Sequence, residues 1–331
     1  MRLRPLDFVL RKLKMQKGLN KPGASLNDRP VRVLKFNIEN KYEGFTVREY
    51  LNQIVKLSQH QISSLKFRAD GIVINGRTRR VTCILKENDI LEIGLKDAGS
   101  AYLDPGDFTA PPDILYEDED ILVVNKKPGM VCHPSPGHYC DTVANQVAAY
   151  CRMKNENWTI RLIGRLDMDT SGILLFAKNS ETAAMLTRQR NEGRIEKIYL
   201  AVCDSIIEDD KGKIEKRIAR DEEKLGKMKI SEDGKEAATY YKVLQRTNNK
   251  SLISVRIEHG RTHQIRIHMA SIGHPLEGDS FYGNGICNKD YAALHAYKSS
   301  FIQPFTGEDI EVTAPIPQKI NDEFNLKEII L

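Results

Sequence analysis

The chain has 331 residues, of which 40% are hydrophobic, so it is long enough for two domains with ordinary cores. It contains no run of about 18 apolar residues and no apolar segment followed by a cleavage site near the N-terminus, so neither a membrane span nor a secretory signal is expected. The six cysteines form no C-x-x-C pair, which is typical of reduced thiols in a cytoplasmic protein.

The formal net charge of +5 is concentrated at the start of the chain. Residues 1–30 carry eight Lys and Arg against two Asp and Glu, a surplus of six, so the remainder is close to neutral. A basic N-terminal extension on a near-neutral body is suited to contact with a polyanion. An ordinary solvated extension would have the same composition, and charge alone leaves both interpretations open.

Residues 31–96 predict a compact α+β domain. The expected elements are a strand at 31–38, two short helices capped by Thr46 and Ser58, a strand at 72–74, a hairpin turn at Asn75-Gly76 and a strand at 90–93. Cations exposed on the second helix and the hairpin could meet phosphates. These cations are Lys66, Arg68, Arg77, Arg79 and Arg80. A basic but inert domain would show the same pattern.

Residues 97–112 are rich in Gly, Pro, Ala and Asp without periodicity, which indicates a linker. Residues 113–331 predict an α+β domain with a mixed, mostly antiparallel sheet, because strands dominate and no βαβ alternation occurs. The expected strands are 121–124, 172–177, 195–203, 237–244 and 252–257, and the expected helices are 180–191, capped by Ser180, and one from Thr262 to Gly273.

Metal, serine and nucleotide chemistry are each weakly supported. The stretch "CHPSPGHYC" (132–140) holds two cysteines and two histidines, but adjacent Cys and His cannot easily point at one metal ion, and no second ligand pair is near. Ser171 lacks the G-x-S-x-G turn that exposes a nucleophilic serine. Phosphate-binding glycine loops are absent from the sequence, so we do not expect a nucleotide cofactor. Together with the poor ligand spacing in 132–140, this leads us to expect neither a metal nor a cofactor.

A carboxylate in "GRLDMDTSG" (164–172) is the remaining candidate. The segment precedes a buried strand and has a glycine at each end, so it could present Asp167 to a cleft. Ionised Asp167 could act as a nucleophile or a base, with Arg266 on a later helix favouring the ionised state. Alternatively, Asp167 or Asp169 forms an Asx-turn with its own backbone, and the local pattern by itself favours that turn.

Four motifs together resemble a known family. They are GRLDMDTSG, KIYLA (197–201), GRTHQIRIHMASIGHPLEGD (260–279) and ALHAYKSSFIQPFTGEDIEVTAPIP (293–317). In this order and spacing they are similar to the RluA-type large-subunit ribosomal RNA pseudouridine synthases. The basic domain, through "SQHQISSLKFRADGIVING" (58–76), resembles the RNA-binding module named after ribosomal protein S4. The resemblance covers about residues 45–320.

The resemblance implies the pseudouridine synthase fold and an isomerase that converts uridine to pseudouridine in RNA without a cofactor. By position it implies that Asp167 is catalytic, that Tyr199 packs on the target base and that Arg266 pairs with Asp167. Asp169 falls at a tolerant position. The expected partner is 23S ribosomal RNA or the pre-ribosomal large subunit, with the protein acting as a monomer in the cytoplasm.

RNA contacts near the catalytic loop follow in the same way. Arg165 matches an arginine that helps to hold RNA, and Lys197 is expected to add a phosphate contact. Gly164 stands where the family usually has histidine, and Lys127 where proline is usual. Neither departure removes Asp167, so an active enzyme is expected. Two alternatives are the same chemistry on transfer RNA, and an RNA-binding assembly factor in which Gly164 marks weakened catalysis.

Overall fold

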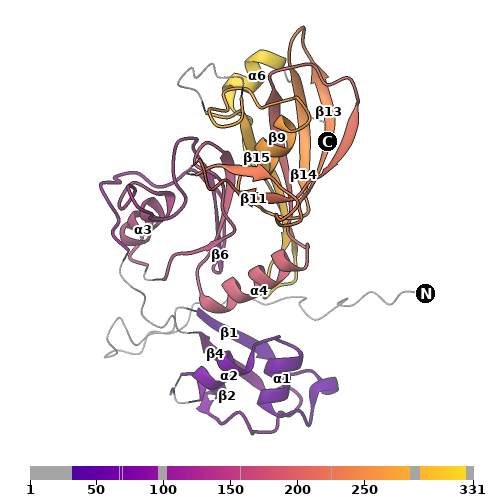
Figure 1. The fold of residues 1–331 in the computed structure, drawn as a ribbon. Helices are drawn as coiled ribbons and strands as arrows, with labels where there is room; N and C mark the ends of the chain where they lie inside the picture. The colour runs from indigo at the N-terminus through magenta and orange to yellow at the C-terminus, as the bar shows by residue number, and fades with distance from the viewer. Residues whose placement is uncertain are drawn as a thin grey trace, which may run out of the picture.

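The computed structural model describes residues 32–66, 68, 70–95, 103–156, 158–224, 226–283 and 291–325 (Figure 1). The expected basic extension, residues 1–30, lies outside the described residues. A four-stranded sheet, a ten-stranded sheet and a two-stranded hairpin carry the described part of the chain. Within it, no helix is long and apolar enough to cross a membrane.

The four-stranded sheet has the order β1-β4-β2-β3, with antiparallel neighbours. Its elements are β1 (Arg32–Asn37), α1 (Val47–Gln53), α2 (Gln59–Leu65), β2 (Ile72–Ile74), β3 (Arg77–Thr78) and β4 (Ile90–Leu95), with a 3-10 turn, η2, at Asn40–Tyr42. Thr46 and Ser58 each form a capping box, as the local pattern predicts. Asn75 and Gly76 have φ of 50° and 75°, the positive values that a tight hairpin turn requires.

The ten-stranded sheet has the order β10-β13-β14-β9-β15-β8-β6-β5, with β16 paired to β15 and β7 to β8. The strands are β5 (Ile114–Glu117), β6 (Ile121–Lys126), β7 (Arg161–Ile163), β8 (Ser171–Ala177), β9 (Glu196–Cys203), β10 (Lys211–Glu215), β13 (Ala238–Arg246), β14 (Ser251–Ile257), β15 (Leu294–Ile302) and β16 (Asp309–Thr313). The pair β8–β15 is parallel and the other pairs are antiparallel. This confirms an α+β fold with a mixed, mostly antiparallel sheet.

Helices and a separate hairpin accompany the large sheet. They are α3 (Val143–Met153), α4 (Ser180–Asn191), α5 (Gln264–Ala270), α6 (Gln318–Phe324) and the hairpin of β11 (Ile218–Arg220) and β12 (Met228–Ile230). The N-cap of α4 is Asn179 rather than Ser180, because the Asn179 side chain accepts a hydrogen bond from the N–H of Thr182. The start of α5 is two residues later than expected, because the left-handed φ of 56° at His263 is incompatible with a helix there.

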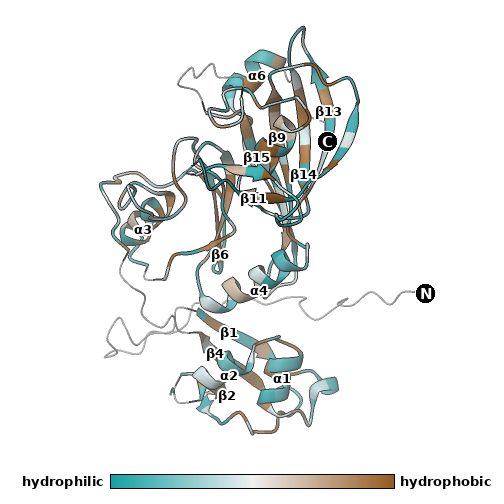
Figure 2. Cartoon of the chain, in the orientation of Figure 1, coloured by the Kyte–Doolittle hydropathy of each residue, from teal (hydrophilic) through white to brown (hydrophobic). Residues whose placement is uncertain are grey.

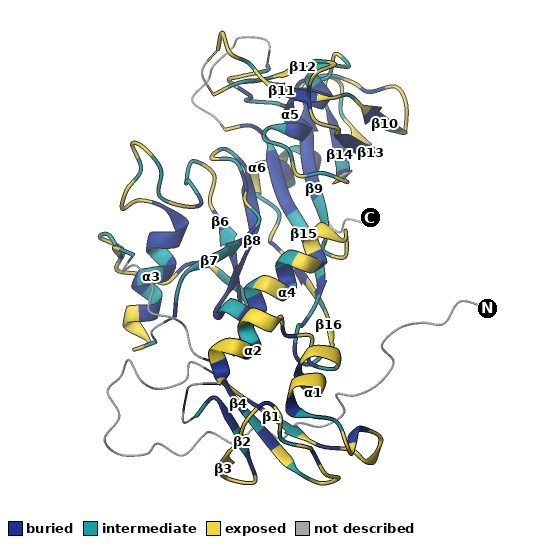
Figure 3. Cartoon of the chain, turned by 60° about the horizontal axis from the view of Figure 1, so that its bottom comes forward, coloured by how far each residue is buried: buried dark blue, intermediate teal, exposed yellow. Residues whose placement is uncertain are grey.

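The core of the large sheet surrounds β8, whose seven residues are all buried (Figure 3). Figure 2 shows apolar residues concentrated on the sheet strands and polar residues on outer helix faces. Gly172, with φ of +102°, permits the parallel contact of β8 with β15. A β-carbon at Gly172 would lie 2.2 Å from the carbonyl oxygen of Ala296, so only glycine allows this approach.

The two sheets are joined by specific contacts near the start of β6. Arg32 of β1 pairs with Glu119 and, through Nε, with buried Asp120 at 3.2 Å. Gln303, just after β15, donates from Nε2 to Asp120 at 3.1 Å. Phe305 then packs into the core of the small sheet. The position of the small sheet on the large one is therefore set by both a buried charge and an apolar contact.

Candidate active site

Residues 164–170 connect β7 to β8 and form one wall of a pocket. Segments far apart in the chain supply the other walls, namely β9, the start of α5 and β15. The lining includes Arg165, Asp167, Thr170, Tyr199, Thr262, Ile265 and Leu294. The fold thus brings together the motif residues that the sequence separates.

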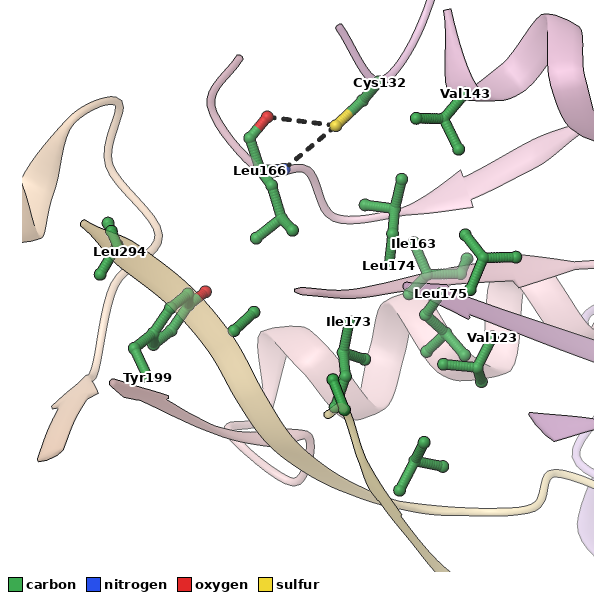
Figure 4. Packing of buried hydrophobic residues seen from close by; sticks show 14 of the residues in the cluster. Val123, Cys132, Val143, Ile163, Leu166, Ile173, Leu174, Leu175, Tyr199 and Leu294 are labelled. Carbon is green, nitrogen blue, oxygen red and sulfur yellow. Dashed lines mark hydrogen bonds between the residues drawn. The ribbon is translucent and has the colours of Figure 1, made fainter. Parts of the chain in front are cut away.

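The backbone around Asp167 is fixed from two directions. The Cys132 thiol donates to the carbonyl of Leu166 at 3.1 Å, and its sulfur accepts from the N–H of Leu166 at 3.4 Å (Figure 4). The N–H of Thr170 donates to the carbonyl of Asp167 at 3.2 Å, which closes a turn. These contacts hold the loop without using the Asp167 side chain.

Lys126, the last residue of β6, is a buried cation beneath the same loop. Its Nζ donates to the carbonyls of Lys127, Met130 and Met168 at 2.9, 2.7 and 2.9 Å. Burial lowers the pKa of Lys126 to about 8, against the opposing pull of nearby negative charges that include Asp167. Lys126 therefore fixes the peptide that follows Asp167 and places positive potential below its carboxylate.

The Asp167 carboxylate itself has no hydrogen-bond or ion-pair partner among the described residues. Its side chain is half-buried at the pocket. An Asx-turn would require the carboxylate to accept a hydrogen bond from its own backbone neighbourhood. The geometry therefore differs from that alternative and leaves the Asp167 carboxylate available to a ligand.

Arg266 is paired differently from the expectation. It is buried and bonds to Asp279 with two parallel contacts, from Nε at 2.8 Å and from Nη2 at 2.7 Å. Its Nη2 also lies 3.1 Å from Asp169 Oδ2. Arg266 thus acts on Asp167 only through space, and Asp169, expected at a tolerant position, is an ion-pair partner. The reason is geometric, because the carboxylate of Asp279 faces α5 and takes up the guanidinium fork.

Tyr199 lies in β9 beside Leu294 of β15, and both line the pocket (Figure 4). The ring is buried, with 6% of the residue exposed. Burial, and secondarily the negative charge of Asp167, raise the pKa of Tyr199 above its ordinary value. The phenol therefore stays neutral, and its ring forms an apolar part of the pocket that Asp167 also lines.

Arg165 and Lys197, the two cations expected to contact RNA near the catalytic loop, differ in their relation to the pocket. Arg165 is exposed at the pocket, where its Nη2 donates to the hydroxyl of Thr262. Lys197 is half-buried on β9, two residues before Tyr199. Arg165 thus lies in the loop that carries Asp167, whereas Lys197 is not among the residues that line the pocket.

Four of the five cations expected on the small sheet are exposed: Lys66, Arg77, Arg79 and Arg80. Arg68 differs, because only 19% of its side chain is exposed and its Nε lies 3.3 Å from Asp70 Oδ1. Arg68 follows α2 and turns inward against β4, where a β-carbon at Gly94 would lie 3.5 Å from its Nη2. Its expected role as an exposed RNA contact does not match this position.

Sequence reasoning missed Lys126, Cys132 and Asp279 as residues that build the site. Two of these residues could have been found from the sequence. Asp279 is a charged residue at the end of the third motif, and Lys126 is a charged residue at the end of a mostly apolar strand, where a buried charge needs a specific partner. The sequence suggests Cys132 only as a possible metal ligand. Its sulfur is instead engaged with Leu166.

The fold and the pocket define a class of protein, and comparisons with known proteins agree with it. The family described as RNA pseudouridylate synthase matches residues 120–271. An uncharacterised RNA pseudouridine synthase of Bacillus subtilis, YjbO, is 33% identical over 83% of this chain and 97% of its own length. Ribosomal large subunit pseudouridine synthase D of Zymomonas mobilis is 33% identical over 84% of this chain and 92% of its own.

A solved structure supports the same assignment. The human protein RNA pseudouridylate synthase domain containing 1 superposes with a TM-score of 0.53 and 28% identity, covering 61% of this chain and 82% of that one. The chain belongs to the RluA-type family of RNA pseudouridine synthases. It is accordingly an isomerase that converts uridine to pseudouridine in RNA.

Proposed function

We propose that this enzyme modifies uridines of large-subunit ribosomal RNA, with Asp167 as the catalytic group and without a cofactor. The observation that supports the role of Asp167 is its carboxylate, which has no partner among the described residues and lines a pocket that Tyr199 also lines. Support for the ribosomal substrate comes from relatives named ribosomal large subunit pseudouridine synthase D, such as the Neisseria meningitidis protein, 39% identical over 66% of this chain and 61% of its own length.

The reaction demands little besides positioning and one carboxylate. The bond from C1′ to N1 of uracil breaks, the base rotates, a bond from C1′ to C5 forms, the C5 hydrogen leaves as a proton and N1 gains one. Asp167 either attacks the sugar or the ring, or abstracts a ribose proton. Oxidation state and composition are unchanged, so the chemistry consumes neither an oxidant nor a group donor.

A uridine held within RNA structure must be extruded to reach the pocket, at a cost of a few kcal/mol. Stacking on the Tyr199 ring offsets part of that cost, at about 1–3 kcal/mol per base. Phosphate contacts at Arg165 and Lys197 would offset more. We assign residues 31–96 as an S4-like RNA-binding module, joined by the linker 97–112 to the catalytic domain 113–331. We expect the enzyme to recognise the shape of the RNA and its unpaired loops.

The cell compartment and the assembly state belong to the same proposal. Cys83, Cys132, Cys140, Cys151 and Cys203 are free thiols among the described residues, which fits a reducing cytoplasm. We infer that the enzyme works there as a monomer.

The substrate is tested with transcripts of 23S ribosomal RNA and of transfer RNA. Pseudouridine mapping after incubation with the full chain is expected to find modified sites in the 23S transcript only. Modification of transfer RNA alone would contradict the ribosomal assignment. Tight binding of 23S RNA without pseudouridine in either transcript would favour the assembly-factor alternative, with Gly164 marking lost catalysis.

Changing Tyr199 separates stacking from hydroxyl chemistry. Tyr199→Leu is expected to lower kcat/KM by about 5–150-fold, because about 1–3 kcal/mol of base stacking is lost. Tyr199→Phe keeps the ring and should stay within about 3-fold of wild type, since the Tyr199 hydroxyl has no hydrogen-bond partner in the described part of the chain. Equal losses in the two variants would assign the effect to the hydroxyl instead.

A further inference from the structure

The turn that follows β6 lies against the catalytic loop at the edge of the pocket. Nζ of Lys126 donates to the carbonyls of Lys127 and Met168, each at 2.9 Å, so one buried ammonium group holds both backbones. The N–H of Gly129 also donates to the Met168 carbonyl at 2.9 Å. Met168 directly follows Asp167, which lines the pocket, and Met168 itself is 44% exposed. An apolar side chain is therefore presented to solvent beside the pocket.

Tyr291, three residues before β15, covers the same turn. A β-carbon at Gly129 would lie 2.2 Å from Oη of Tyr291 and 2.5 Å from its Cζ, so the phenol rests on the backbone of Gly129. Tyr291 is nevertheless 45% exposed. Single exposed apolar side chains are common on protein surfaces. Met168 and Tyr291 differ from such cases because both residues contact Gly129, and so they lie together at the edge of the pocket.

Lys127 adds a cation to this surface. It is exposed, two residues before Gly129, and makes no ion pair with a carboxylate in the part of the chain that the structure describes. Lys126, by contrast, uses its ammonium group on three backbone carbonyls. An aromatic ring, a thioether and a cation match the two parts of a nucleotide, because a base stacks on apolar side chains and its phosphate attracts a lysine.

We propose that Tyr291, Met168 and Lys127 form a subsite for one unpaired nucleotide of the RNA strand whose uridine occupies the active-site pocket. The base packs on Tyr291 and Met168, and its phosphate contacts Lys127. The proposal rests on the proposed function, because it takes RNA as the ligand of the pocket. Binding the neighbouring nucleotide offsets part of the cost of extruding the uridine. Tyr291 and Lys127 are thus binding residues and not catalytic residues.

The first test compares two single-stranded RNA probes of about twelve nucleotides with the same number of phosphates. One is oligouridylate, and the other keeps one central uridine and lacks the bases elsewhere. The wild-type full chain should bind oligouridylate more tightly. Tyr291→Leu is expected to raise Kd for oligouridylate about 5-fold, because stacking is lost, and to change Kd for the abasic probe less than about 2-fold. Tyr291→Phe keeps the ring and should bind both probes like wild type.

Tyr139→Leu is the matched control. Tyr139 is 69% exposed, but it lies beside Asp104, since Nδ2 of Asn145 donates to the carbonyls of both residues. This variant should leave both Kd values unchanged. An equal loss for the two probes in Tyr291→Leu, or no loss with either, would overturn the stacking role of Tyr291. Equal binding of the two probes by the wild-type protein would overturn it as well.

Lys127→Gln tests the phosphate contact. It is expected to reduce the slope of log K against log salt by about 0.7, the value for one phosphate of a single strand, whereas Lys127→Arg should keep the slope. An unchanged slope in Lys127→Gln would overturn the assignment of Lys127. Neither test requires turnover or ribosomal RNA. A protein that binds RNA without forming pseudouridine would still distinguish the two probes, so failure of the proposed function and failure of the subsite give different results.

Discussion

Asp167→Asn is expected to abolish pseudouridine formation, with a loss of at least about 1,000-fold in kcat. Asparagine keeps the size of the side chain but cannot attack as an anion or accept a proton. The loop should keep its shape, because Leu166 and Met168 are held through their backbones by Cys132 and Lys126. Release of tritium from uridine labelled at C5 of RNA measures the loss directly.

Asp169→Asn is the matched control for Asp167→Asn. It makes the same change of charge two residues away, where the carboxylate contacts Arg266 at 3.1 Å. Its turnover should fall by less than about 10-fold, since Arg266 keeps its two bonds to Asp279. If Asp167→Asn retains a tenth of wild-type turnover, or if the two variants lose equally, Asp167 is not the catalytic group.

Asp279→Ala is expected to destabilise the fold by about 3 kcal/mol, because it leaves the buried Arg266 guanidinium without its bidentate partner. For a domain of about 150–250 residues, that corresponds to a decrease in Tm of about 6–12 °C. Asp169→Ala removes the outer, partly exposed partner of the same arginine and should cost about 1 kcal/mol. Thermal unfolding of the three proteins checks the order, and equal losses would contradict it.

The same ion pair predicts the direction of acid destabilisation. Burial alone would raise the pKa of Asp279, but the hydrogen bonds and charge of Arg266 outweigh it and hold the pKa below the ordinary value of 3.8. The stabilisation of the fold by the ionised Asp279 is therefore complete above pH 3.8. It is lost as the pH falls through the lower pKa that Asp279 has in the folded state. Asp279→Asn should remove this part of the acid dependence, which urea unfolding at a series of pH values would show.

Local patterns predicted the small sheet well because its elements are specified by neighbours in sequence. The caps at Thr46 and Ser58 and the turn at Asn75-Gly76 need only residues within four positions. The large sheet was predicted less completely. No helix was expected at α3, although Thr142 caps it with Asn145, and no strand was expected at β15, whose mixture of polar and apolar residues hides its burial between β8 and β9.

The candidate site shows where sequence reasoning ends. The motifs identified Asp167, Tyr199 and Arg266, but not which carboxylate Arg266 contacts. That choice depends on the loop after α5, where Asp279 also accepts hydrogen bonds from the N–H groups of Phe281 and Tyr282. This turn orients the Asp279 carboxylate toward Arg266, and that orientation cannot be predicted from the spacing of residues in the sequence. The resemblance placed Asp169 at a tolerant position, whereas in the structure its carboxylate pairs with the buried Arg266.

One strand, β15, links the chemistry to the small sheet. Leu294 at its start lines the pocket, while Gln303 and Phe305, just beyond its end, contact Asp120 and the small-sheet core. Nine extended residues span about 30 Å, a length that β-sheet pairing on both sides keeps nearly constant. The strand thus acts as a fixed spacer, so an RNA that reaches both ends must present its target uridine at a set distance from the place where the small sheet is attached.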